Sequence, residues 1–321
     1  MLNESELARG RSYSYRLFGG LFLAGVTAAY LPWIEAVDSL AAVLPLPFDP
    51  HEAAAAHHDL FAFHLHPYAS LFLDDSGLSG GAVAEQTAAA YRAAHFPHST
   101  DDTAPDHLGQ ALLFLAFLTE KEAAGEATQG TQQQFLRENL LPWLFPALTA
   151  VQMQSYPFYA ELSRLTLALV MSHYDAAAGS PTIPLPVAAT LIDGRQADLR
   201  AMVRYLTTPY LSGVYCGRHD IARLARALNL PRGFGGRETM LLNLFRSGGQ
   251  YETAVPLLQQ LGEFVARWQT AYSQTAAAYP RAASFLQPWQ SRAAQTQLLL
   301  QQGQTMVNAE RQDAADSHLP K

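Results

Sequence analysis

Helix-forming residues dominate this sequence. Alanine is abundant, and few segments show β-branched residues alternating with polar ones. Alanine is the strongest helix former, whereas half-buried strands need an alternation with a period of two. The pattern therefore predicts an all-α protein. We expect helices over residues 6–43 with a break near Pro32, and over 51–65, 81–94, 105–125, 131–150, 155–175, 195–206, 220–228, 237–247, 254–278 and 281–302.

The length of the chain bounds its domain organisation. Its 321 residues suggest one large domain or two ordinary ones, and an apolar fraction of 49% is ample for a core. Residues 176–187 contain three Pro together with Gly179 and Ser180, which is typical of a linker. We expect an N-terminal helical domain at 1–178, a linker at 179–192, a second helical domain at 193–302 and a flexible polar tail at 303–321.

Charge and cysteine content narrow the function. The net charge is −7, so no global attraction to nucleic acid is expected. Charged residues make up only 15% of the chain, which suggests a face covered by a partner. Cys216 is the single cysteine, so an intrachain disulfide is impossible. A reducing compartment, and hence a cytoplasmic location, follows as the default expectation.

An uncharged apolar run from Leu17 to Ile34 follows three arginines near the N-terminus. Its length is near the lower limit for crossing a bilayer, which would suit a signal anchor. Several glycines and Pro32 interrupt it, and it lacks a small-residue cleavage site. We therefore expect no stable membrane insertion.

A polar loop at 98–103 precedes a strongly apolar helical run. Pro105 suits a first helical turn because its missing N–H would be unpaired there, and Asp106 would complement the helix dipole. This predicts that Asp106 and His107 lie side by side at a helix start. One interpretation is an ordinary cap before a core helix. A second is an acid/base pair, for which the sequence offers no evident nucleophile.

Four segments resemble, in order, the motifs of one family. They are His58–Phe61, Pro67–Asp74, Pro105–Leu108 and Phe135–Leu144. The set is similar to the signature of the TorD/DmsD family of cytoplasmic chaperones for molybdenum-cofactor enzymes, and the likeness spans roughly residues 10–175. Two positions depart from it, because Ala111 stands where the family often has Glu and Asn139 where it has His.

The resemblance implies a TorD-like helical bundle with an additional helical C-terminal region. It implies a chaperone, not an enzyme, without metal or cofactor of its own. Its partner would be the apo form of a molybdoenzyme catalytic subunit of the dimethyl-sulfoxide-reductase type, or the twin-arginine signal peptide of that subunit. The chaperone would assist cofactor insertion and delay twin-arginine export. A monomer or a helix-exchanged dimer is expected.

The same resemblance implies a groove that holds the client or its signal peptide, with carboxylates for the basic part and aromatic surface for the apolar part. Asp75, Asp101 and Asp102 could add to its acidic side. The expected binding residues are Tyr68, Ser70, Phe72, Asp74, Pro105, Asp106, His107 and Leu108.

Two functions of other classes stay open at this point. Many histidines fall in one third of the chain, and His64-x-His66 and His95-x-x-His98 have spacings that metal ligands use, so a metalloenzyme is one alternative. Residues 218–246 hold six arginines around a segment similar to half of a helix-turn-helix, so a helical DNA-binding regulator is another. The helix after that turn is mainly apolar, which disfavours base reading.

Overall fold

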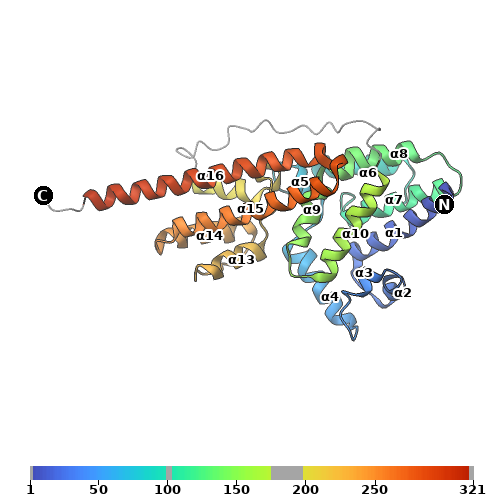
Figure 1. Ribbon diagram of the computed structural model, residues 1–321, viewed down its shortest axis with the longest axis horizontal. Helices are drawn as coiled ribbons and strands as arrows, with labels where there is room; N and C mark the ends of the chain where they lie inside the picture. The colour runs from blue at the N-terminus through green and yellow to red at the C-terminus, as the bar shows by residue number, and fades with distance from the viewer. Residues whose placement is uncertain (1–2, 99–102, 175–197, 318–321) are drawn as a thin grey trace. The chain divides into compact units, whose positions relative to one another are not determined.

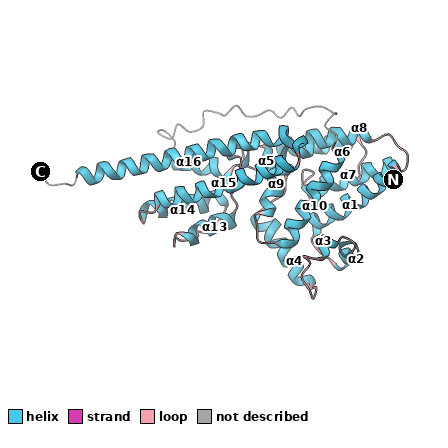
Figure 2. Cartoon of the chain, in the orientation of Figure 1, coloured by secondary structure: helices cyan, strands magenta, loops and turns pink. Residues whose placement is uncertain are grey.

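The computed structural model describes residues 3–98, 103–174 and 198–317. These residues form helices joined by turns and loops, with no strand among them (Figures 1 and 2). The all-α prediction is confirmed. The chain divides into two compact units, 1–183 with 281–285 and 184–280 with 286–321. The linker expected at 179–192 lies outside the described residues.

The first unit is a bundle of helices, several of them short. In chain order they are α1 (Glu4–Ala24), η1 (Ala28–Tyr30), α2 (Leu31–Glu35), α3 (Asp38–Ala41), α4 (Pro50–His58), η2 (Asp59–His64), α5 (Ala69–Leu73), α6 (Gly81–Ala93), α7 (Leu108–Ala123), α8 (Gln129–Phe135), η3 (Leu136–Leu140), α9 (Leu141–Gln152) and α10 (Pro157–His173). Both η2 and η3 are π-helical turns.

The first helical segment breaks earlier than the sequence predicted. Helix α1 ends at Ala24 and is capped by Gly25, whose φ is 73°, and a Cβ on Gly25 would lie 2.8 Å from the His57 Cβ atom. Glycine is needed because other residues resist positive φ and no room exists for a side chain. Pro32 lies in the first turn of α2, where its missing N–H costs nothing. The break predicted near Pro32 was therefore misplaced.

Helices α1 and α7 pack against each other along a seam of small residues. Ser5 and Ser12 of α1 donate through their hydroxyls to the carbonyls of Ala123 and Ala116, each at 3.0 Å. One further step of seven residues leads to Gly19, beside Gly109. These pairs run in opposite directions along the two helices. The seam thus fixes an antiparallel register and brings the two backbones unusually close.

At the glycine end of this seam, no side chain fits. A Cβ on Gly19 would lie 2.8 Å from the carbonyl oxygen of Gly109, and a Cβ on Gly109 would lie 2.7 Å from that of Gly19. It would also lie 2.5 Å from the Leu23 Cγ atom. Glycine at both positions is what lets α7 begin directly against α1.

Aromatic rings fill the centre of the first unit on the other side of α7. Phe114 lies 4.7 Å from Phe135, 4.8 Å from Tyr91 and 5.3 Å from Phe96, measured between ring centroids. Such edge-to-face and tilted contacts add to the hydrophobic gain from burial. The Tyr91 hydroxyl donates to the Pro105 carbonyl at 2.8 Å, so this cluster also holds the loop that precedes α7.

A buried polar chain crosses the same unit. The Tyr15 hydroxyl lies 2.9 Å from His173 Nδ1, and His173 Nε2 lies 2.7 Å from Gln132 Oε1. An amide oxygen can only accept, so Nε2 carries the proton and Nδ1 accepts from Tyr15. The Gln132 amide donates in turn to Glu122 Oε2 at 2.9 Å. Burial lowers the pKa of His173 to about 3, with the Arg11 charge as a smaller cause.

The second unit is also helical, as expected. Its helices are α11 (Leu199–Thr207), α12 (Pro209–Ser212), α13 (Arg218–Ala227), α14 (Arg237–Gln250), α15 (Ala254–Ala278) and the part of α16 (Ala283–Ser317) that follows residue 285. The short η5 (Pro280–Ala282) and the first residues of α16 span the boundary at which the chain passes through residues 281–285 of the first unit. Helix α16 continues well beyond residue 302, where the last helix was expected to end. Within the part of the chain that the structure describes, no helix is both long and apolar enough to cross a membrane.

Hydrogen bonds to one tight turn organise this second unit. The turn ends α12 at Gly213, whose φ is 75°, and a Cβ there would lie 2.6 Å from the backbone nitrogen of Ala293. Tyr272 donates to the Gly213 carbonyl at 2.8 Å, and Thr296 donates to the Ser212 carbonyl at 2.7 Å. These bonds connect α12 to α15 and α16.

Candidate functional site

The two loops that carry the family-like motifs lie side by side. Tyr68 and His107 form an isolated antiparallel bridge. The backbone N–H of Ala69 donates to the Asp106 carbonyl at 2.9 Å, and that of Leu108 donates to the Pro67 carbonyl at 2.8 Å. We call residues 67–74 and 105–108 the paired loops. Segments nearly forty residues apart in sequence thus meet in one local structure.

Asp106 holds this structure together from inside. Its side chain is 1% exposed, and Oδ2 accepts from the Ser70 backbone N–H at 2.9 Å and from the Ser70 hydroxyl at 2.6 Å. The Ser70 oxygen accepts in turn from the Gly80 N–H at 2.9 Å. Because Ser70 lies in the first turn of α5, the carboxylate caps that helix and not its own. Oδ1 has no hydrogen-bond partner among the described residues.

His107 caps α7. The helix begins at Leu108, three residues later than predicted, and His107 Nδ1 accepts from the Gly109 N–H at 3.0 Å. This bond needs an unprotonated Nδ1. Burial lowers the pKa of His107 to about 3, with the charge of His57 as a smaller cause. Its ring meets Tyr68 edge to face at 5.0 Å.

Asp106 and His107 therefore do not act as an acid/base pair in this structure. The carboxylate is bonded to Ser70, whereas the imidazole nitrogen Nδ1 is bonded to Gly109. Each group stabilises a helix start. The interpretation as caps before a core helix accounts for both residues.

The other predicted binding residues divide into buried and accessible ones. Phe72 is fully buried and stacks on Trp143 with centroids 6.0 Å apart. Ser70, Asp106, His107 and Leu108 are buried as well. The residues with partly exposed surface are Tyr68, Asp74 and Pro105. Burial and then the charge of Asp106 raise the pKa of Tyr68. Asp101 and Asp102 lie outside the described residues.

We expect Asp106→Ala to destabilise the first unit by about 3 kcal/mol. The substitution leaves the buried Ser70 amide and hydroxyl without their acceptor, and each unsatisfied group costs roughly 1–3 kcal/mol. Urea denaturation of the full chain followed by circular dichroism measures the loss. Asp75→Ala, at an exposed position of the same region, should change the unfolding free energy by less than about 0.5 kcal/mol. Equal losses in the two variants would contradict this role.

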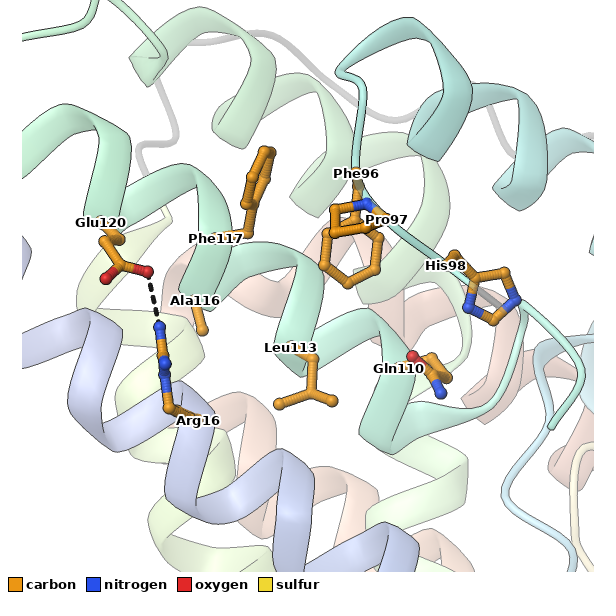
Figure 3. A pocket seen from close by; sticks show the side chains of 9 residues that line it. All are labelled: Arg16, Phe96, Pro97, His98, Gln110, Leu113, Ala116, Phe117 and Glu120. Carbon is orange, nitrogen blue, oxygen red and sulfur yellow. Dashed lines mark hydrogen bonds and ion pairs between the residues drawn. The ribbon is translucent and has the colours of Figure 1, made fainter. Parts of the chain in front are cut away.

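A first cavity lies between α1, α7 and residues 96–98. Its volume is about 420 Å³, and Figure 3 shows Leu113 between its two ends. Arg16 and Glu120 pair at 2.5 Å at one end, and His98 and Gln110 lie at the other. Both charged side chains are more than half exposed, so their pair contributes little stability. None of these residues was among the predicted client-binding residues, although His98 is part of the His95-x-x-His98 spacing.

A second, smaller cavity lies among α4, α10 and the loop before α4. Its volume is about 220 Å³. Its lining consists of Val26, Leu44, Pro45, Phe48, Asp49, Glu52, Ala53, Ala56, Phe158 and Tyr159. We call it the α4 cavity. Most of these side chains are apolar, and the two carboxylates give it an acidic side. None of these residues was among the predicted binding residues.

The histidines among the described residues do not come together in the way that metal ligands would. Among the described residues, no group of three or more His, Cys, Asp or Glu side chains is placed to hold a metal ion. His57 Nε2 donates to the Phe22 carbonyl at 3.1 Å, and His66 Nδ1 lies 2.9 Å from the Phe61 carbonyl. These side chains satisfy backbone groups within unit 1.

The arginine-rich region 218–246 supplies part of the core of the second unit. In α14, Met240, Leu241 and Leu244 are buried. Arg237 stacks over Tyr215 with 4.7 Å between the guanidinium carbon and the ring centroid, and Arg223 pairs with Asp220. Asp220 lies in the first turn of α13 and accepts from the Gly217 N–H at 2.9 Å, so the helix begins two residues before residue 220, where it was expected to begin. Two of the arginines thus have contacts within the unit.

Comparison with known proteins locates the paired loops within a family match. Residues 27–149 match the model of the nitrate reductase delta subunit family, which is a family of molybdoenzyme maturation chaperones. The match includes both paired loops, and the second unit lies outside it. It supports a relation to redox-enzyme maturation chaperones. No curated protein and no solved structure matches the chain.

Proposed function

We propose that this protein is a cytoplasmic chaperone of the TorD/DmsD type that binds an apo-molybdoenzyme catalytic subunit. It assists cofactor insertion into that client and delays twin-arginine export, either through the folded part of the client or through its signal peptide. The observation that carries the proposal is the family match over residues 27–149, which contains both paired loops. The function is binding and not turnover.

The accessible part of the paired loops is the proposed client contact. Tyr68 offers an aromatic edge, Asp74 a carboxylate and Pro105 an apolar ring, all partly exposed. Asp106, Ser70 and His107 are buried and bonded to neighbours, so they act as positioning residues that hold this surface in shape. This division replaces the idea that the Asp106 carboxylate itself engages basic client residues.

The test is a pull-down of the tagged full chain from its native cytosol under anaerobic conditions, with bound proteins identified by mass spectrometry. We expect one molybdoenzyme catalytic subunit that lacks its cofactor. The double variant Tyr68→Ala with Asp74→Ala should recover about tenfold less of that subunit, because loss of one or two central contacts typically costs this much affinity. Recovery of only the cofactor-loaded enzyme, or of no molybdoenzyme, would overturn the proposal.

A further inference from the structure

The α4 cavity has the size and lining of a side-chain pocket. An apolar cavity of about 150 Å³ holds a benzene ring. The α4 cavity measures about 220 Å³ and is lined mainly by apolar side chains. It therefore has room for one large apolar side chain from another molecule.

Helix α4 is incompletely covered on the side that faces this cavity. None of its residues is buried, although Ala53 and Ala56 line the cavity wall. In the loop that leads to it, Leu46 is 80% exposed beside Pro45. Helices in folded proteins gain most of their stability by burying one apolar face. Here that face is left available to a partner.

The floor of the cavity carries an unused hydrogen-bond donor. Tyr159 is 3% exposed, and its hydroxyl oxygen contacts the backbone of Val26, whereas its proton has no acceptor among the described residues. Buried hydroxyl groups normally donate as well as accept, so a Tyr159 proton without an acceptor beside a cavity points to an acceptor that a partner brings. A backbone carbonyl of a bound peptide would supply it.

The charges around the cavity select a basic partner. Asp49 and Glu52 line it, and no ion pair joins either of them to a Lys or Arg among the described residues. They belong to a long segment, 17–91, that contains neither Lys nor Arg. Its carboxylates are Glu35, Asp38, Asp49, Glu52, Asp59, Asp74, Asp75 and Glu85. The summed negative charge of these carboxylates exceeds the whole-chain net charge of −7, so the excess negative charge of the protein is concentrated in this segment.

We propose that the α4 cavity binds a peptide segment in which a large apolar side chain is flanked by arginine or lysine. The apolar side chain enters the cavity, the basic residues pair with Glu52 and Asp49, and the Tyr159 hydroxyl donates to a peptide carbonyl. That the segment belongs to the client rests on the proposed function. The cavity is a contact additional to the paired loops.

The first measurement is fluorescence anisotropy of a dye-labelled peptide with two arginines beside a leucine-rich stretch, added to the full chain. We expect Ala56→Trp, which fills the cavity, to weaken binding about tenfold. Ala55→Trp places the same ring on an exposed position of the same helix and should bind like the original chain. Equal affinity of the two variants would overturn the proposal.

The charge contacts have their own matched variants. Asp49 also caps α4, so Asp49→Ser removes its charge and keeps a good capping residue. Combined with Glu52→Gln, it should weaken binding about tenfold at low salt and flatten the salt dependence. Glu263→Gln, in the second unit, should have no effect. A peptide with glutamates in place of the arginines that binds equally well would contradict the charge selection.

Tyr159→Phe keeps the proposal testable if the tryptophan variant fails to fold. Removing the hydroxyl deletes only its contact with the Val26 backbone, so the melting temperature should fall slightly, while peptide affinity falls about threefold. Unchanged affinity in this variant would overturn the hydroxyl contact.

The peptide assay and the pull-down together distinguish the cavity proposal from the proposed function. If the peptide binds through the cavity but the pull-down recovers no molybdoenzyme, only the proposed function is refuted. Client recovery that is insensitive to Ala56→Trp would refute the cavity's role with that client.

Discussion

Gly109→Ala should destabilise the protein by about 2–3 kcal/mol, and Gly109→Val by more. The added Cβ would lie 2.7 Å from the Gly19 carbonyl oxygen and 2.5 Å from the Leu23 Cγ atom. The first of these neighbours is backbone, so α1 and α7 must separate. Overpacking of this kind typically costs 1–3 kcal/mol. Urea denaturation of the full chain measures the change.

Gly10→Ala is the matched control for this substitution. Gly10 also lies within a helix, α1, and a Cβ there would have nothing within 4 Å. Alanine is a better helix former than glycine by about 1 kcal/mol, so this variant should be slightly more stable than the original chain. The same chemical change should thus have opposite signs at the two sites. Stabilisation by Gly109→Ala would mean that the close contact between the helices is absent.

Acidification should weaken the fold through two buried histidines. His107 and His173 each have a folded pKa of about 3, against a usual value near 6.5. Below pH 6.5 the unfolded chain binds protons that the folded chain does not, so stability falls as the pH falls through this window towards 3. Between pH 7.5 and pH 5 each histidine should remove about 2 kcal/mol.

Two substitutions separate these contributions. His107→Asn removes a titrating group and keeps a side-chain acceptor at the cap of α7. His173→Gln removes the other and disturbs the chain from Tyr15 to Gln132, so its stability at neutral pH should fall. In both variants the loss between pH 7.5 and pH 5 should be smaller by about 2 kcal/mol. His51→Gln, at an exposed site, should follow the original pH profile. An unaltered profile in all three would place the acid sensitivity elsewhere.

The sequence predicted local structure well and long-range contacts less well. The helix over 254–278 has the bounds that its composition indicated, and α6, α10 and α14 lie within a few residues of theirs. Helix ends were missed where a tertiary contact decides them. Helix α1 stops before Gly25, where the His57 side chain leaves no room for a Cβ. Helix α7 begins only at Leu108, because His107 is held in the bridge with Tyr68. No local propensity contains such information.

In the candidate site, too, the local motifs could be predicted from the sequence, whereas the long-range contacts could not. Resemblance selected both paired loops, but burial of Asp106 and His107 depends on partners far away in sequence and could not be read from spacing. His173 was overlooked because its partner Tyr15 lies 158 residues away. One signal was available in the sequence: the absence of Lys and Arg from residues 17–91 marks the acidic side of the α4 cavity. The small residues spaced by seven in α1 and α7 were another.

The seam between α1 and α7 also sets an order of events during synthesis. Helix α1 ends at Ala24, whereas the residues that cover it extend to Ala123. At translation rates of about 5–20 residues per second, synthesis of α7 is completed on the order of 5–20 s after synthesis of α1. During that interval Phe18, Leu21 and Phe22, all buried later, have no α7 to pack against. The nascent chain therefore passes through a stage in which its own first helix needs protection from aggregation.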